Sequence, residues 1–325
     1  MPLLPPAIAA TDFITGERLQ ALCDLSIISE PILSFHTSLS ETVTKVTLPE
    51  LFTETTGGFP MSLELPILLN RFLARSTLRR IIKRIKSAQS IFLYTHLLPG
   101  FIEYVLPRLE HPFVLMTHNS DNLVTDRFRP LLDNPILKRW FASSAVISHP
   151  QLECLPIGLA NAQWPHGDIA KMATEMAKQQ PKTYRVYVNF SPNTHPSRAP
   201  LLELLKARGF VVAPSNLPYD RYLSELAEHR YCISPLGNGF DAHRTWESLL
   251  LGVVPIVTSE IAAAFPELPM LAVSNWKQVT PQFLDEAYQR FENAAFDYSR
   301  LRLSWWKKRI HETIRSRDKD FSGFR

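Results

Sequence analysis

The sequence has few cysteines, and the three that it has are far apart. Cys23, Cys154 and Cys232 are odd in number and lie within apolar runs. A disulfide framework or a metal cluster needs cysteines at short, regular spacings, so neither is indicated. We expect these residues to be buried free thiols in a reducing compartment.

The sequence also lacks extended apolar stretches. No segment reaches the roughly 18 uncharged apolar residues that a membrane-spanning helix needs. The amino terminus, MPLLPPAIAATDF, has neither a basic leader nor a long apolar run. We therefore expect a cytoplasmic protein. Internal repeats and low-complexity tracts are absent from the sequence as well.

The chain carries only a small excess of positive charge. The formal net charge is +4 over 325 residues, too small to indicate a nucleic-acid-binding protein. Hydrophobic residues make up 45% and charged residues 20% of the chain, which is an ordinary globular composition. At this length, two domains of about 150 residues each are expected.

Short apolar runs alternate with helix-like stretches along the chain. This alternation is typical of parallel sheets covered by helices on both faces. The sequence therefore predicts an α/β protein of the GT-B kind, with two doubly wound Rossmann-like domains. The domains are expected to face a central crevice, because open α/β sheets bind ligands beyond the carboxyl ends of their strands. The apolar runs are residues 91–98, 113–121, 185–191, 210–215, 231–236, 253–260 and 270–275.

The domain boundary is predicted between residues 170 and 183, where a proline-rich segment gives way to a polar helix-like stretch. This boundary defines an amino-terminal, acceptor-side domain at 1–175 and a carboxyl-terminal domain at 182–280. Residues 281–325 are predicted to form terminal helices that pack back across the domains.

The most informative segment is YCISPLGNGFDAHRTWESLLLGVVPIV, residues 231–257. It predicts a strand, a glycine loop, a helix and a second strand. Gly237 and Gly239 let the backbone approach a ligand closely. Asp241 is expected to cap the helix, whose amino terminus has N–H groups and a partial positive charge suited to phosphate.

Arg244 and Glu247 are three residues apart and share one face of that predicted helix. A guanidinium binds a diphosphate bidentately, and a carboxylate accepts hydrogen bonds from both hydroxyls of a ribose. A surface ion pair is the alternative explanation for the same spacing, and such a pair contributes little.

A longer pattern surrounds this pair: a Ser-Pro, a glycine loop, an Asp, an Arg, and a Glu followed by Gly-x-x-Pro-Ile-Val. It resembles the carboxyl-terminal signature of exostosin-type glycosyltransferases, glycosyltransferase family 47. The resemblance implies a GT-B fold whose carboxyl domain holds the donor, with Glu247 on the ribose and Arg244 on the diphosphate or sugar. The matching residues are Ser234, Pro235, Gly237, Gly239, Asp241, Arg244, Glu247, Gly252, Pro255, Ile256 and Val257.

Upstream, residues 188–205 are similar to the first strand, loop and helix of the family's donor domain. Thr194 is then expected in the crevice. Arg198, in the first turn of the helix, can meet phosphate, and an exposed helix arginine is the alternative. The predicted donor-site residues are Arg244, Glu247, Asp241, Gly237, Ser234, Gly239, His243, Arg198, Asn189 and Ser191.

Two predicted strands of the first half end in Thr-His, which places His96, His118 and Asp121 at strand ends. An inverting transferase needs a base that removes the proton of the acceptor hydroxyl. Asp121 or His118 is the expected base, with His96 third. A hydrogen-bonded residue that holds a loop is the alternative explanation for each histidine.

Two further segments resemble motifs of uncharacterised relatives of the same family. The first is THNSD, residues 117–121. The second is CLPIGLANAQWPHGD, residues 154–168, with Asn161, Trp164 and His166.

The Asp-x-Asp spacing that holds a metal in many glycosyltransferases occurs only at Asp318 and Asp320, in the charged tail. We therefore expect no metal, and no cofactor besides the nucleotide sugar, because arginine and a helix dipole can stabilise the diphosphate. Residues 68–89 predict a basic amphipathic helix. It either packs on the core with a solvated basic face or contacts an anionic membrane or lipid-linked acceptor.

These features predict an inverting, metal-independent glycosyltransferase. It moves a sugar from a nucleoside-diphosphate sugar, with UDP expected, to a glycan or glycolipid acceptor. A fucosyltransferase-like or retaining GT-B enzyme is the alternative within the class. A non-catalytic two-domain protein that binds sugars or nucleotides is the alternative outside it. A nucleic-acid partner is not expected.

Overall fold

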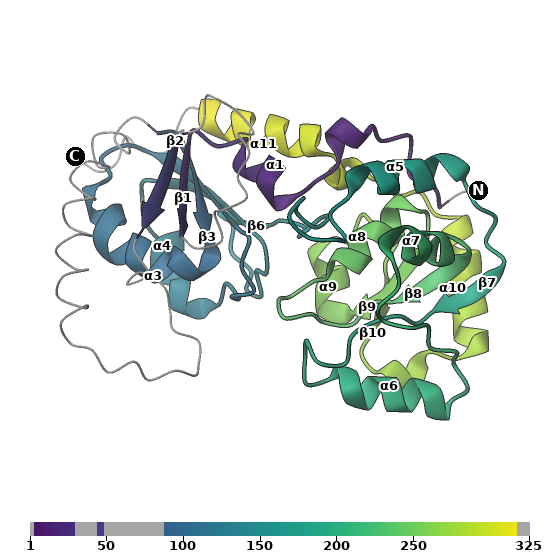
Figure 1. Ribbon diagram of the computed structural model, residues 1–325. Helices are drawn as coiled ribbons and strands as arrows, with labels where there is room; N and C mark the ends of the chain where they lie inside the picture. Colours follow the sequence, from purple (N-terminus) through teal and green to yellow (C-terminus); the bar gives the residue numbers. More distant parts are fainter. Residues whose placement is uncertain (1–2, 30–43, 49–87, 317–325) are drawn as a thin grey trace. The chain divides into compact units, whose positions relative to one another are not determined.

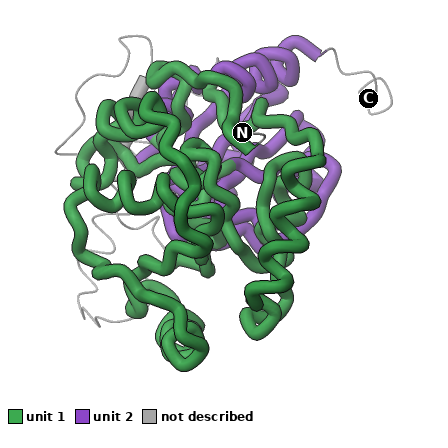
Figure 2. Tube along the Cα trace, turned by 90° about the vertical axis from the view of Figure 1, so that its right-hand side faces the viewer, with its two compact units in different colours: residues 1–16, 156–303 green, residues 17–155, 304–325 purple. Residues whose placement is uncertain are grey.

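The computed structural model describes residues 3–29, 44–48 and 88–316, and the chain forms two compact units. Unit 1 comprises residues 1–16 and 156–303, and unit 2 comprises residues 17–155 and 304–325 (Figure 2). Each unit contains one sheet of parallel strands, so the predicted α/β class is confirmed.

Unit 2 is built on a six-stranded sheet in the order β2-β1-β3-β4-β5-β6, with every neighbouring pair parallel (Figure 1). The side chains of β3 and β4 are buried at every position. A strand that is covered on both faces is buried in this way along its whole length. The strands are β1 (Leu25–Ser29), β2 (Thr44–Leu48), β3 (Ser90–Tyr94), β4 (Phe113–His118), β5 (Leu137–Ala142) and β6 (Leu152–Cys154).

Most described helical segments of unit 2 are short, and the long helix α11 comes from the far end of the chain. These segments are α1 (Gly16–Gln20), η3 (Thr95–Leu97), α3 (Leu98–Gly100), η4 (Phe101–Val105), η5 (Leu106–Arg108), η6 (Asp126–Phe128), α4 (Arg129–Leu132) and α11 (Leu303–Arg315).

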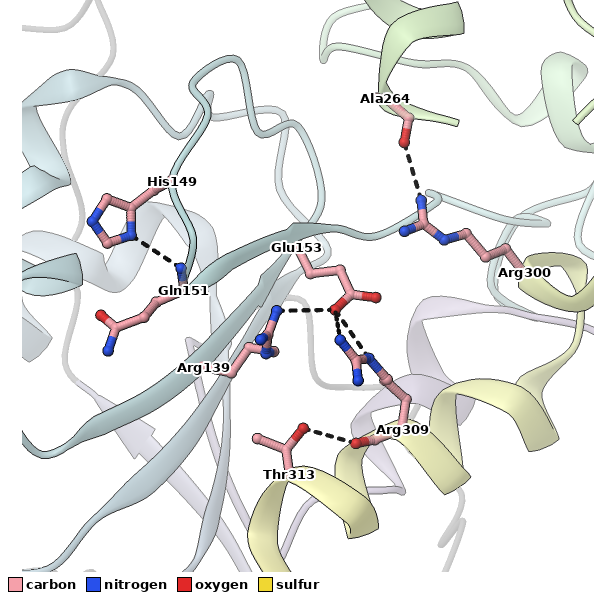
Figure 3. Close-up of polar contacts among 8 residues, drawn as sticks. All are labelled: Arg139, His149, Gln151, Glu153, Ala264, Arg300, Arg309 and Thr313. Carbon is pink, nitrogen blue, oxygen red and sulfur yellow. Dashed lines mark hydrogen bonds and ion pairs between the residues drawn. The ribbon is translucent and has the colours of Figure 1, made fainter. Parts of the chain in front are cut away.

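A polar cluster holds α11 against the sheet of unit 2 (Figure 3). Glu153 on β6 accepts three hydrogen bonds at Oε2. Arg139 Nη1 donates at 3.3 Å, and Arg309 Nε and Nη2 donate at 3.2 and 3.1 Å. Nearby on α11, the buried ring of Trp306 packs edge-on against Phe141, with centroids 6.1 Å apart. Apolar packing and a shared carboxylate thus join a distant segment to this unit.

Unit 1 is built on a four-stranded parallel sheet in the order β10-β9-β8-β7. Helices α6 and α10 contribute to a core beside Tyr231 and Ile233 of β8. Cys232, between them, points to the opposite face of the sheet, and α8 packs against β8. Helices therefore cover both faces of this sheet. The strands are β7 (Tyr184–Tyr187), β8 (His229–Ile233), β9 (Val254–Thr258) and β10 (Leu271–Val273).

The helices of unit 1 include the polar helix expected near residue 170, which is α5. Asp168 caps it by accepting hydrogen bonds from the N–H groups of Ala170 and Lys171 at 3.0 and 3.2 Å. The helical segments are η1 (Ala10–Asp12), α5 (Ile169–Lys178), α6 (Arg198–Ala207), α7 (Tyr219–Ala227), α8 (His243–Leu250), α9 (Ser259–Ala264), η7 (Trp276–Gln278), α10 (Pro281–Glu292) and η8 (Ser299–Leu301).

The predicted strand at residues 210–215 does not form. The Ala213 N–H donates to the carbonyl oxygen of Val188 at 2.9 Å, and Val211 is 86% exposed. Pro214 has no N–H to continue a ladder. The other six predicted apolar runs each overlap a strand.

The two units divide the chain differently from the predicted domains. Residues 1–16 and 156–175 were expected in the amino-terminal domain but cluster with the second sheet, and α11 clusters with the first. Long-range contacts decide this division. One is a parallel bridge between Thr15 and Leu159 in unit 1, which composition along the chain does not indicate.

No helix among the described residues is both long and apolar enough to cross a membrane. The basic segment 68–89 lies outside the described residues except for its last two positions, and Asp318 and Asp320 lie outside them entirely. The predictions for these two segments therefore stay predictions.

Glu153→Gln tests the attachment of α11. Losing the shared charge between two arginines is expected to lower the free energy of unfolding by about 1–3 kcal/mol, measured by urea denaturation. The control is Glu312→Gln on the same helix, because Glu312 forms an exposed pair with Lys308 at 3.8 Å. That change is expected to cost less than about 0.5 kcal/mol. Equal losses in the two variants would contradict the proposed attachment.

Candidate functional site

The module predicted from residues 231–257 is present in unit 1. Strand β8, helix α8 and strand β9 follow one another, and β8 and β9 are neighbours in the sheet. Ser234 is buried at the start of the intervening loop, with its hydroxyl 2.8 Å from that of Thr245 on α8. Gly252 ends the helix at a φ of +67°, where an added Cβ would meet Leu4 at 2.7 Å. Glycine is therefore required at this turn.

Asp241 does not cap α8, so that prediction is wrong. The N-cap residue is Ala242, and no side chain of the described residues caps the helix. Asp241 Oδ2 instead accepts hydrogen bonds from Trp246 Nε1 at 2.7 Å and from the Ile157 N–H at 2.9 Å. Burial raises the pKa of Asp241 to about 6. This carboxylate joins the segment that follows β6 to the amino end of α8.

Arg198 is buried rather than an exposed helix residue, so the alternative reading of it is wrong. Its Nε donates to the carbonyl oxygen of Leu236 at 2.6 Å. Its Nη1 and Nη2 donate to the carbonyl oxygens of Ser191 and Pro235 at 3.2 and 3.3 Å. Burial lowers the pKa of Arg198 to about 10. The structure thus places it as a link between two loops, and its predicted phosphate contact stays a prediction.

The other loop residues predicted to form the site also lie in unit 1. Asn189 is buried and donates from Nδ2 to the carbonyl oxygen of Pro214 at 2.6 Å. An added Cβ at the buried Gly237 would lie 3.3 Å from the Asp241 carbonyl oxygen, so the loop is closely packed there. Gly239 and Ser191 are half-buried.

Glu247 is 3% exposed, so it does not belong to a surface ion pair, and that alternative is wrong. Tyr219 and Tyr222, on α7, donate their hydroxyls to Oε1 and Oε2 at 3.1 and 2.7 Å. Burial raises the pKa of Glu247, while the bond from Tyr222 and the charge of Arg244 lower it. A carboxylate has about four lone-pair sites, so acceptor capacity remains beside the two tyrosines.

The tyrosine pair was missed from the sequence. Tyr219 and Tyr222 are three residues apart, which places both on one face of α7. That spacing indicates that the two tyrosines can share a partner. The sequence around them does not identify the partner, because Glu247 lies on another helix.

His243 and Arg244 occupy the first turn of α8. His243 Nδ1 donates to the Gly158 carbonyl oxygen at 2.8 Å. Arg244 is half-buried, and its Nε has no hydrogen-bond partner among the described residues. Desolvation and then the charge of Arg244 lower the pKa of His166, so this guanidinium lies close enough to act on the 156–168 segment. A positive charge therefore stands at an uncapped helix amino terminus.

In unit 2, the structure brings the three predicted base candidates to the carboxyl ends of β3 and β4. Tyr94 and His118 are partners in the strand register. His118 is buried, and its Nδ1 lies 3.0 Å from Asn119 Oδ1. The ring of His96 lies 5.7 Å from that of Tyr94, and burial lowers the pKa of His96. Asp121 is exposed.

A cavity of about 640 Å³ lies along β7, the edge strand of unit 1. It is lined by β7, by residues 208–211 and 213, and by parts of α7, β8 and α10. None of the predicted donor-site residues lines it. Among the described residues, no group of three or more His, Cys, Asp or Glu side chains is placed to hold a metal ion.

The fold and this arrangement define a two-unit α/β protein with a candidate anion site at the start of α8. No protein-family model and no curated protein matches the sequence. The exostosin resemblance therefore stays a prediction.

Among solved structures, the chain is similar to the glycotransferase of kitacinnamycin. The identity is 11%, the TM-score is 0.39, and the alignment covers 89% of this chain and 95% of that one. It is also similar to an α-glucosyltransferase in complex with UDP-glucose and DNA containing an abasic site. There the identity is 8%, the TM-score is 0.30, and the coverages are 90% and 95%. Neither likeness identifies a donor, an acceptor or a reaction for this chain.

Tyr222→Phe tests how Glu247 is held. Removing the hydroxyl leaves a buried carboxylate short of a donor, so the free energy of unfolding is expected to fall by about 1–3 kcal/mol. The folded pKa of Glu247 is already raised, and losing a donor raises it further. This group's contribution to stability then falls as the pH rises between its unfolded and folded pKa values. The loss is therefore expected to be larger at about pH 8 than at about pH 5, by urea denaturation.

The control is Tyr298→Phe, which removes a hydrogen bond of 3.1 Å to the carbonyl oxygen of Leu3. A neutral acceptor does not titrate, so that loss is expected to be the same at both pH values. A Tyr222→Phe loss that is also independent of pH would contradict the role given to Glu247.

Proposed function

We propose that the chain is a glycosyltransferase of the GT-B type whose unit 1 binds a nucleoside-diphosphate sugar. The observation that carries the proposal is the first turn of α8. There Arg244 has a buried Nε without a partner among the described residues, and no side chain caps the helix. A guanidinium and a helix amino terminus both favour a diphosphate.

The surroundings support an anionic ligand at this point. Arg198 fixes the glycine loop that precedes α8 by donating to the carbonyl oxygens of Pro235 and Leu236. His243 stands beside Arg244 with its ring fixed by the Gly158 carbonyl. Preorganised donors of this kind stabilise the charge that develops on a leaving diphosphate. We expect UDP as the nucleotide and no requirement for a metal.

Glu247 is proposed to contact the ribose through the lone pairs that its two tyrosines leave unused. Its carboxylate position is set by the bonds from Tyr219 and Tyr222, so it is preorganised rather than mobile. A ribose hydroxyl would add a third donor to a group that accepts about four.

The proposed reaction is an inverting transfer to a glycan or glycolipid. The acceptor oxygen attacks the anomeric carbon, a base takes the hydroxyl proton, and the bond from that carbon to the diphosphate oxygen breaks as the nucleoside diphosphate leaves. The proposed base comes from Asp121, His118 and His96 at the strand ends of unit 2, with Asp121 as the first choice.

Arg244→Ala tests the donor site. We expect affinity for UDP, measured by isothermal titration calorimetry, to fall about ten- to a hundredfold, because a charged hydrogen-bond donor to the diphosphate is lost. The control is Arg185→Ala, since Arg185 is an exposed residue paired with Asp285 at 3.2 Å, and its loss should leave affinity unchanged. If UDP fails to bind the wild type, or binds Arg244→Ala equally well, the proposed donor site is wrong.

Asp121→Asn tests the base. Transfer from a nucleotide sugar that stabilises the wild type is expected to fall at least about a hundredfold, while donor affinity stays the same. Release of nucleoside diphosphate measures the rate. The control is Asp126→Asn, whose exposed carboxylate pairs with Arg129 at 2.7 Å. Full turnover in Asp121→Asn would exclude Asp121 and leave the two histidines.

A further inference from the structure

The segment between β6 and α5 presents a row of aromatic rings beside Arg244. The rings of Trp164 and His166 are stacked, with centroids 6.3 Å apart and planes 25° apart. The ring of His166 in turn lies 5.8 Å from that of His243, in the first turn of α8. The row therefore leads from the candidate diphosphate site to Trp164.

Trp164 stands at the outer end of this row and is 54% exposed. A tryptophan carries a large apolar ring, and a single exposed one needs no explanation by itself. Here the ring of Trp164 stacks on that of His166, whose pKa is lowered by desolvation and then by the charge of Arg244. The exposed ring thus belongs to the neighbourhood of a cation.

The loop that carries Trp164 is rigidly built. The Trp164 N–H donates to the Asn161 carbonyl oxygen at 3.0 Å, and the Gly167 N–H donates to the Trp164 carbonyl oxygen at 2.9 Å. A Cβ at Gly167 would come within 2.0 Å of the Asn161 carbonyl oxygen, so only glycine fits there. A loop held in this way presents its side chain without a large ordering cost on binding.

Both ends of the loop are also attached to neighbouring helices. Asp168, directly after Gly167, caps α5. At the other end, the Ile157 N–H donates to Asp241 and the Gly158 carbonyl accepts from His243. The position of Trp164 relative to α8 is therefore defined by hydrogen bonds within unit 1.

We propose that Trp164 is the platform on which the base of the nucleoside diphosphate stacks while Arg244 holds its phosphates. This proposal rests on the proposed function and adds the residue that recognises the nucleoside half of the donor. Every nucleobase has an aromatic face, and stacking on a tryptophan tolerates different bases. In a nucleoside diphosphate, the flat base is joined through the ribose to the diphosphate. This order matches the aromatic row, which begins at Trp164 and ends beside the guanidinium of Arg244.

The test compares UDP, GDP and inorganic pyrophosphate by isothermal titration calorimetry. In Trp164→Ala, affinity for the nucleotide that binds the wild type is expected to fall about tenfold, while pyrophosphate affinity is unchanged, because pyrophosphate has no base to stack. Trp164→Phe keeps an aromatic face and is expected to recover most of the loss. Arg244→Ala is expected to weaken nucleotide and pyrophosphate alike.

Tryptophan fluorescence gives a second readout. Stacking of a base on Trp164 is expected to quench wild-type emission, and Trp164→Phe should lose that quenching. The control is Trp276→Phe, because Trp276 is a half-buried residue of unit 1 that packs against the hydrophobic core. It should keep both the quenching and the affinity.

The outcomes separate the two proposals. If neither nucleotide nor pyrophosphate binds the wild type, the proposed function fails and the platform fails with it. If a nucleotide binds the wild type and Trp164→Ala equally well, the platform is overturned while the donor site stands. Stacking of Trp164 on a sugar ring alone would also leave nucleotide affinity equal in the wild type and in Trp164→Ala.

Discussion

The candidate site depends on one buried carboxylate. Asp241 accepts hydrogen bonds from the Trp246 indole and from the Ile157 N–H, 84 positions away in the sequence. These two bonds bring the 156–168 segment to the amino end of α8. The contact of His243 with Gly158 and the aromatic row beyond it follow from that placement. Without an acceptor at Asp241, the Ile157 N–H and the indole would each lose a partner, at a cost of about 1–3 kcal/mol apiece.

The charges buried around the site are satisfied by neutral partners rather than by one another. Glu247 accepts from two tyrosines, Asp241 from an indole and an amide, and Arg198 donates to three backbone carbonyls. The charge of Arg244 is consequently not paired in a salt bridge with any described residue. A cation without a salt-bridge partner among the described residues is suited to an anionic ligand.

Much of this arrangement was predictable and much of it was not. The strand, glycine loop, helix and strand of residues 231–257 follow from local pattern, because apolar runs, glycine and helical spacing act over a few residues. The capping role predicted for Asp241 was wrong, because Asp241 precedes the N-cap residue Ala242 and its carboxylate accepts from an indole and from a distant backbone amide. Arg198 and Glu247 were identified as important, but the carbonyls and hydroxyls that they contact lie on other elements.

By itself, the sequence determined the α/β class, the parallel strands and the position of the helix that carries Arg244. These features depend on burial patterns that repeat every two or every three to four residues. The tertiary structure alone decided that residues 156–168 belong beside α8, that α11 belongs to unit 2, and which groups satisfy the buried charges. Each of these depends on hydrogen bonds and packing between residues far apart in the chain, and local spacing contains no information about such partners.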